Sequence, residues 1–124
     1  MSNKTGDFIW YELLCEDADA AASFYGKVIG WQVADGGNPT LDYRILQMPD
    51  IDTGAPNGVG GLLQLDGAMR AGGARPLWLG YIHVEDVDAS LAALKSAGAT
   101  VQMPASDITG VGRIAMVVPT PDGV

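Results

Sequence analysis

The segment Glu16-Asp17-Ala18-Asp19-Ala20 has a close copy 69 residues later in the chain, Glu85-Asp86-Val87-Asp88-Ala89. At the same spacing, Arg44-Ile45 has its counterpart in Arg113-Ile114. Because two separate segments agree on one spacing, chance is a poor explanation for the match. The sequence therefore predicts two copies of one structural unit.

Each copy begins with a segment in which apolar residues alternate, residues 8–15 in the first copy and 77–84 in the second. A period of two predicts a β-strand. Asp17 and Asp86 follow these strands directly, and an aspartate at that position accepts hydrogen bonds from the free N–H groups of a helix start. A helix is therefore expected after each strand.

The two helices are expected to stop at Gly30 and Gly98, since glycine is common just after a helix end. The remaining apolar segments predict five further strands, at residues 31–33, 43–48, 59–65, 100–103 and 113–118. The fold class is thus α+β, with two βαβββ modules in tandem whose curved mixed sheets form a cleft.

The two modules are expected to form a single domain over residues 1–124, a length that suits one continuous core. The first module covers about residues 7–66 and the second about residues 77–124. Residues 67–76 between them contain three glycines and end in proline, which is a linker composition rather than that of a helix or strand.

Charge and composition exclude several classes of partner. The formal net charge is −8, from 15 acidic and 7 basic residues, so the surface repels nucleic acid and anionic membranes. The amino terminus lacks the apolar core of a signal peptide, and no apolar run approaches the ~20 residues that cross a bilayer. The single cysteine, Cys15, favours a reducing compartment, and we expect a cytoplasmic protein.

Taken together, these segments resemble the vicinal oxygen chelate superfamily, which includes glyoxalases, extradiol dioxygenases and bleomycin resistance proteins. The resemblance is carried by residues 16–25, Gly30-Trp31, residues 84–89 and residues 97–99. Four shorter stretches are most similar to a glyoxalase-like or hydroxylase-like branch: residues 8–11, 30–31, 59–62 and 78–81. The resemblance implies a small molecule held in the cleft between the modules.

Metal-using members of that superfamily carry a first-strand histidine seven residues before the aspartate that opens the helix, and a histidine or glutamine at the equivalent place in the second half. Counting back in this sequence gives Trp10 and Leu79, neither of which can ligate a divalent cation. Residues 62–65 offer no carboxylate for the third ligand, and the fourth would come from a strand after residues 121–123. We therefore expect no cofactor.

Five residues are predicted to bind a ligand in the cleft: Trp10, Glu12, Gln64, Tyr81 and His83. Trp10 and Tyr81 offer aromatic surface, which suits an apolar or a cationic ligand. Core packing or a dimer contact would explain these two aromatic residues as well.

Glu12 and His83 are the predicted catalytic residues. Glu12 is one carboxylate among apolar neighbours on a central strand, which is costly unless it has a role or a partner, and Arg44 and Arg113 are the candidate partners. His83, the single histidine, is expected on the same strand face as Tyr81, either as a proton-transfer group or as a hydrogen-bonded wall residue. A metal site remade from Glu12 and His83 stays open as an alternative.

Three functions follow from these expectations. The favoured one is a metal-independent protein that binds a small molecule, similar to the bleomycin resistance proteins. The second is a metal-independent glyoxalase-like or hydroxylase-like enzyme that uses Glu12 and His83 as acid and base. The third is an interaction module covered by a partner chain. The resemblance places a last strand of the second module after residues 121–123, and without it a sheet edge would be left unpaired. Either further residues supply that strand or a second chain covers the edge, and a homodimer is expected.

Overall fold

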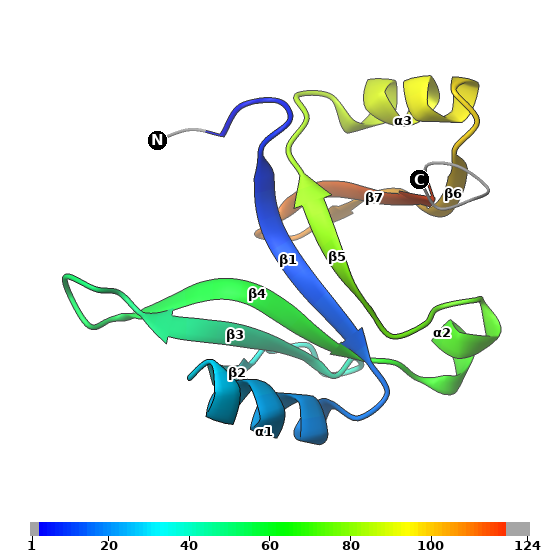
Figure 1. Cartoon of the computed structure of the whole chain (residues 1–124). Coiled ribbons are helices and arrows are strands. Elements are labelled where there is room, and N and C mark those ends of the chain that lie inside the picture. The colour runs from blue at the N-terminus through cyan, green and yellow to red at the C-terminus, as the bar shows by residue number, and fades with distance from the viewer. Residues whose placement is uncertain (1–2, 119–124) are drawn as a thin grey trace. The chain divides into compact units, whose positions relative to one another are not determined.

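The computed structural model describes residues 3–118, which divide into two compact units (Figure 1). The larger unit contains residues 7–82, and the smaller one contains residues 3–6 together with the part of the chain after residue 82. The division falls after β5 (Leu77–Ile82) because this strand pairs with β1 (Phe8–Cys15) of the larger unit. None of the helices in residues 3–118 is long and apolar enough to cross a membrane.

The larger unit is a five-stranded mixed sheet with the strand order β2-β3-β4-β1-β5. Strand β1 is parallel to β4 and antiparallel to β5, and β3 is antiparallel to both of its neighbours. The other elements of this unit are α1 (Ala18–Val28), β2 (Gln32–Asp35), β3 (Tyr43–Pro49), β4 (Pro56–Gln64) and α2 (Gly67–Ala71). This arrangement places β1 inside the sheet.

The predicted start and end of the first helix are confirmed. The Asp17 side chain accepts a hydrogen bond from the backbone N–H of Ala20 at 3.0 Å, as an N-cap residue does. The chain leaves the helix through Gly30, whose φ of +90° lies in the left-handed region that glycine adopts without strain.

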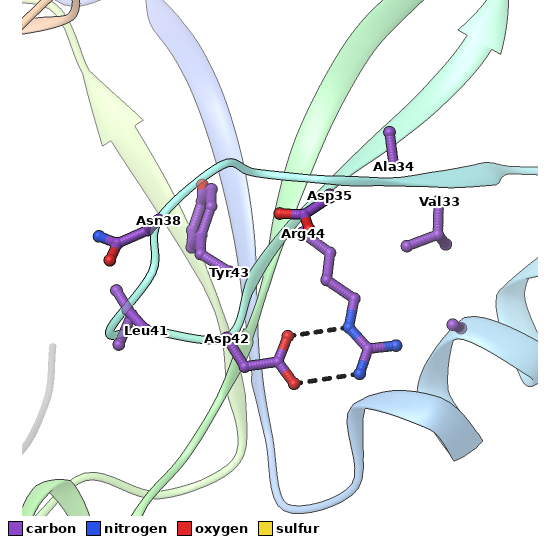
Figure 2. Close-up of a pocket in the computed structure, with 9 residues that line it drawn as sticks. Val33, Ala34, Asp35, Asn38, Leu41, Asp42, Tyr43 and Arg44 are labelled. Carbon is purple, nitrogen blue, oxygen red and sulfur yellow. Dashed lines mark hydrogen bonds and ion pairs between the residues drawn. The ribbon is translucent and has the colours of Figure 1, made fainter.

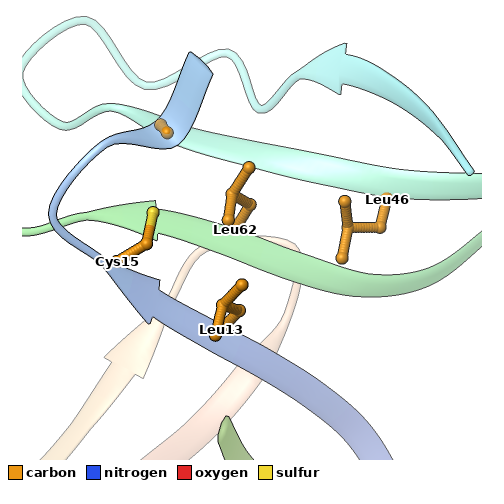
Figure 3. Packing of buried hydrophobic residues seen from close by; sticks show 5 residues of the cluster. Leu13, Cys15, Leu46 and Leu62 are labelled. Carbon is orange, nitrogen blue, oxygen red and sulfur yellow. The ribbon is translucent and has the colours of Figure 1, made fainter. Parts of the chain in front are cut away.

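The core of the larger unit lies between the sheet and α1. Alternate residues of β1, Leu13 and Cys15, are buried there together with Ala18, Leu46 and Leu62 (Figure 3). Cys15 therefore lies on the helix-facing side of β1. Glu12 and Leu14, which alternate with Leu13 and Cys15 along β1, point to the opposite face of the sheet, since successive side chains of a strand alternate.

The smaller unit contains α3 (Val87–Ser96) and an antiparallel hairpin of β6 (Thr100–Ile108) and β7 (Gly112–Val118). Asp86 caps α3 by accepting from the N–H of Ala89 at 3.0 Å, as Asp17 does in the first copy. The final strand that the resemblance places after the turn at residues 121–123 lies outside the described residues.

The repeat extends to tertiary contacts. Arg44 on β3 pairs with Asp19 in the first turn of α1 at 2.9 Å, and Arg113 on β7 pairs with Asp88 in the first turn of α3 at 2.9 Å. Each pair joins a strand to the start of a helix across the same sequence separation of 25 residues. The two copies thus share an interaction as well as an order of elements.

Several elements differ from the sequence prediction. Strand β6 runs to Ile108 rather than to residue 103, and β4 begins at Pro56 rather than at residue 59. Residues 67–76 were expected to hold no regular element, but they contain the short helix α2, because the Asp66 side chain caps it by accepting from the N–H of Met69 at 2.8 Å. Strand β5 ends at Ile82 rather than at Val84, so His83 is not a strand residue.

Candidate functional site

A buried carboxyl group lies near the middle of the five-stranded sheet. Glu12 is only 6% exposed, and among the described residues no other charged or polar side chain is classed as buried. It pairs with Gly61 on β4 and with Leu79 on β5, so its backbone lies between two neighbouring strands of the sheet. The position of the carboxyl group is therefore fixed by two neighbouring strands.

The hydroxyl of Tyr81 donates a hydrogen bond to Oε2 of Glu12 at 3.2 Å. Tyr81 pairs directly with Trp10 on β1, and this makes it the diagonal neighbour of Glu12 on the same face of the sheet. Diagonal neighbours in an antiparallel pair are within reach of long aromatic side chains. The contact is thus a direct result of the β1–β5 register.

Tyr43 reaches the same carboxyl group from β3, on the far side of β4. Its hydroxyl accepts a hydrogen bond from Nε1 of Trp10 at 2.9 Å and also hydrogen-bonds with Glu12. Gly61 on the intervening strand makes room for this, because a Cβ built at Gly61 would collide with the phenol of Tyr43. We call Trp10, Glu12, Tyr43 and Tyr81 the Glu12 cluster.

Burial controls the ionisation of the cluster. Desolvation raises the pKa of Glu12 above its ordinary value, and the hydrogen bonds from Tyr43 and Tyr81 oppose the rise because they favour the charged carboxylate. The pKa of Tyr43 and that of Tyr81 are both raised, first by burial and then by the negative charge of Glu12. Both phenols therefore keep their protons and act as donors to Glu12.

The structure brings together three of the five residues predicted to bind a ligand, Trp10, Glu12 and Tyr81. Gln64 lies apart from them and joins the end of β4 to the start of α1. Its Oε1 accepts from the N–H of Ala18 at 2.8 Å, and its Nε2 donates to the carbonyl oxygens of Glu16 at 2.7 Å and Leu65 at 3.0 Å. The amide of Gln64 is thus already hydrogen-bonded within the chain.

His83 belongs to the smaller unit, and its carbonyl oxygen accepts from the N–H of Gly6 at 2.9 Å. Since β5 ends one residue earlier, the strand alternation that would have aligned His83 with Tyr81 does not extend to it. The role of His83 beside Glu12 stays a prediction.

The arginines proposed as partners of Glu12 are paired elsewhere, so that expectation is wrong. Arg44 binds Asp42 and Asp19, both at 2.9 Å. Arg113 binds Asp88 at 2.9 Å and Asp107 at 3.2 Å. These acids lie close to the arginines along the strands or at the helix starts, whereas Glu12 lies inside the sheet and is stabilised by phenols instead.

Sequence reasoning missed Tyr43 as a member of the cluster. The signal that could have found it is the Gly60-Gly61 pair within the fourth strand. A glycine inside a strand often marks the close approach of another group, and here that group is the ring of Tyr43.

Two surface depressions lie outside the cluster. The larger, of about 460 Å³, is formed by β2, the following loop and the start of β3, and it shares only Tyr43 with the cluster. Figure 2 shows that Arg44 in this depression extends toward α1 and is held by both carboxylate oxygens of Asp42. The smaller, of about 300 Å³, is apolar and includes Trp31 and Trp78. In the first depression Arg44 pairs with Asp42, and the Asp35 carboxylate accepts from the N–H of Gly37. The second has no charged lining residue. The Glu12 cluster is therefore the better candidate site.

The cluster does not fit the divalent metal that its superfamily resemblance implies. Within residues 3–118, no three or more His, Cys, Asp or Glu side chains are grouped so that they could hold a metal ion. Trp10 can only donate a hydrogen bond through its indole N–H, and the raised pKa values keep both phenols protonated. One carboxylate is fewer than the three or four protein ligands of a usual tight site.

Comparison with known proteins gives both sequence relatives and structural neighbours. Proteins named "Putative glyoxylase CFP32" from Mycobacterium bovis and Mycobacterium tuberculosis are each 35% identical to this chain in an alignment 119 residues long that covers 92% of the chain. The chain spans only 40% of the length of these relatives.

Solved structures of methylmalonyl-CoA epimerase share the fold. A single-residue variant of the Streptomyces coelicolor enzyme, bound to 2-nitronate-propionyl-CoA, aligns with a TM-score of 0.57 and 20% identity over 94% of this chain and 89% of that one. A methylmalonyl-CoA epimerase bound to methylmalonyl-CoA and NH4+ aligns equally well, with a TM-score of 0.57, 20% identity and coverage of 94% and 87%. At this identity the likeness shows the fold alone.

The predicted vicinal oxygen chelate fold is thus confirmed by these neighbours and by the mixed α+β architecture. The match to one family runs from residue 8 to residue 124, across both copies of the repeat, and on that basis the chain is a member of the Glyoxalase/Bleomycin resistance protein/Dioxygenase superfamily.

Proposed function

We propose that this chain binds a small organic molecule at the Glu12 cluster and does so without a metal ion. The observation that supports the proposal is the buried carboxyl group of Glu12, which is 6% exposed and meets phenols rather than a cationic side chain. A carboxyl group in such a place is unfavourable for folding unless it is paired or has a role.

Aromatic neighbours support the same proposal. Trp10 and Tyr81 lie beside Glu12 on one face of the sheet, and Trp10 is only partly buried. Such rings provide a large contact area and lose little conformational freedom on binding. A specific polar group among apolar and aromatic surface is the usual composition of a small-molecule site.

The experiment is isothermal titration of the EDTA-treated protein against a panel of cationic and aromatic small molecules, with elemental analysis of the protein before and after treatment. We expect at least one compound to bind more tightly than about 1 mM, the weak end of specific binding. Glu12→Gln should weaken that binding, whereas Glu16→Gln, which removes an exposed carboxylate at the end of the same strand, should not. Binding that is absent after EDTA and restored by a divalent cation would contradict metal independence.

Acid–base catalysis is the second candidate function, favoured by the raised pKa of Glu12. A carboxyl group whose pKa is moved toward neutrality exchanges protons more effectively at cellular pH. Glu12 would transfer a proton to or from a small carbonyl or aromatic substrate, with His83 as its partner in acid–base chemistry. A substrate turned over at the same rate by the double variant Glu12→Gln, His83→Ala would contradict these roles.

We propose a homodimer in the cytoplasm as the working form of the chain. The free thiol of Cys15 is buried and suits a reducing compartment. Strand β5 hydrogen-bonds to β1 along one edge and has no second strand partner among the described residues, so a second copy could cover its other edge. Light scattering tests the dimer, and a strictly monomeric mass would contradict it.

A further inference from the structure

The hydrogen-bond donors of the Glu12 cluster are all directed inward. The indole N–H of Trp10 is used on the hydroxyl oxygen of Tyr43. The single hydroxyl protons of Tyr43 and Tyr81 are used on the carboxyl group of Glu12. Since tryptophan and tyrosine side chains have one such proton each, the cluster has no donor left for a ligand.

Acceptor capacity is what remains. An ionised carboxylate offers about four lone-pair positions, and the two phenols use two of them. Burial and the two phenols shift the pKa of Glu12. Among the described residues, no cationic side chain contributes to that shift. Arg44 and Arg113 are each held by two other carboxylates.

From this arrangement we propose that the Glu12 cluster recognises a primary ammonium group carried on a small apolar or aromatic body. The inference rests on the proposed function and names the ligand class. The cluster lacks a positive charge and free hydrogen-bond donors, and an ammonium group supplies both. It also forms a charge-assisted hydrogen bond with the carboxylate. The rings of Trp10 and Tyr81 attract cations as well.

The same arrangement disfavours other ligand classes. A carboxylate or phosphate would meet the negative charge of Glu12 and find no free donor in the cluster. A neutral carbonyl oxygen would find no donor either. The formal net charge of −8 adds a long-range attraction for cations and a repulsion for anions. Selection by charge sign therefore follows from both the site and the whole chain.

The test compares four compounds with the same phenylethyl body at pH 7: 2-phenylethylamine, 2-phenylethanol, 3-phenylpropionate and the trimethylammonium analogue of the amine. Their dissociation constants are measured by isothermal titration with the wild-type chain and with Glu12→Gln and Glu16→Gln. The amine is expected to bind at least about tenfold more tightly than the alcohol, because it forms a charge-assisted hydrogen bond with Glu12. The trimethylammonium compound has the charge but no N–H, so it should bind more weakly than the amine.

The preference for the amine over the alcohol should disappear in Glu12→Gln and persist in Glu16→Gln, which removes a charge at an exposed site. If Glu12→Gln does not fold, as judged by circular dichroism, the wild-type order of amine, trimethylammonium compound and alcohol still decides the matter. Equal binding of amine and alcohol, or tighter binding of the propionate, would overturn the ammonium inference while leaving small-molecule binding at the cluster intact. Absence of binding by all four compounds would also overturn it, and the broader panel then decides the proposed function separately.

Discussion

Gly61→Ala should damage the Glu12 cluster without changing any residue that belongs to it. A Cβ at position 61 would lie 2.9 Å from Cε2 of Tyr43 and closer still to the phenol oxygen, so the ring has to move. The movement removes the acceptor of the Trp10 N–H and one donor to Glu12. Buried polar groups left without a partner cost about 1–3 kcal/mol each, and forced overpacking costs a similar amount. We therefore expect a loss of about 2–4 kcal/mol in the free energy of unfolding, allowing for partial relaxation.

The assay is urea unfolding followed by tryptophan fluorescence and circular dichroism, for Gly61→Ala in the wild-type background and in the Tyr43→Ala background. Without the phenol, the added methyl group meets no ring, and the same change should alter stability by less than about 0.5 kcal/mol. Gly26→Ala, inside α1, is the control, because its Cβ would lie 3.5 Å from the nearest atom outside the helix, the carbonyl oxygen of Trp31, and alanine favours a helix. An equal effect of Gly61→Ala in both backgrounds would refute the reasoning.

Three further predictions concern the same unit. Because burial raises the pKa of Glu12, the folded protein holds this proton more tightly than the unfolded chain does. The free energy of unfolding of the wild type relative to Glu12→Gln should therefore fall as the pH rises from 4.5 through the raised pKa. Urea unfolding of both proteins at a series of pH values measures this difference in stability, and a difference that rises with pH would contradict the prediction. Gln64→Ala should lower the free energy of unfolding by about 1–3 kcal/mol, since it leaves the N–H of Ala18 and the carbonyl oxygen of Glu16 without their partner, and an unchanged urea midpoint would show that these hydrogen bonds do not matter. Cys15 is 8% exposed and its pKa is raised by burial, so it should react with a disulfide reagent only after unfolding, and rapid labelling of the native protein would be inconsistent with the structure.

Local sequence signals located the elements well. The strand at residues 8–15 and the helix after Asp17 are found where alternation and capping predicted them. These signals work because each depends on residues that are neighbours along the chain. The strand predicted to reach Val84 ends at Ile82 because its partner β1 begins at Phe8, which pairs with Ile82. Pairing with another strand decided that boundary, and alternation alone could not.

The candidate site was predicted in part. Glu12 stood out as a lone carboxylate within an apolar strand, and Trp10 and Tyr81 followed from the predicted faces of two strands that become neighbours. Tyr43 was not found, because its contact with Glu12 crosses β4 and depends on the missing side chain of Gly61. Arg44 was assigned to the wrong acid for a related reason, since charge alone does not say which carboxylate is within reach.

The sequence by itself determined the two-copy order of elements, the helix caps, the core-facing residues of β1 and the superfamily. The elements, the caps and the core-facing residues follow from short periodic patterns and from the repeat at a spacing of 69 residues, and the superfamily follows from the resemblance at residues 16–25, 30–31, 84–89 and 97–99. Only the tertiary structure decided what Glu12 meets. A buried carboxyl group must be hydrogen-bonded, but the choice between an arginine and two phenols depends on the register of β1 with β5 and on the space above Gly61. Those are properties of strands placed side by side, and so the chemistry of the site appears only once the sheet is formed.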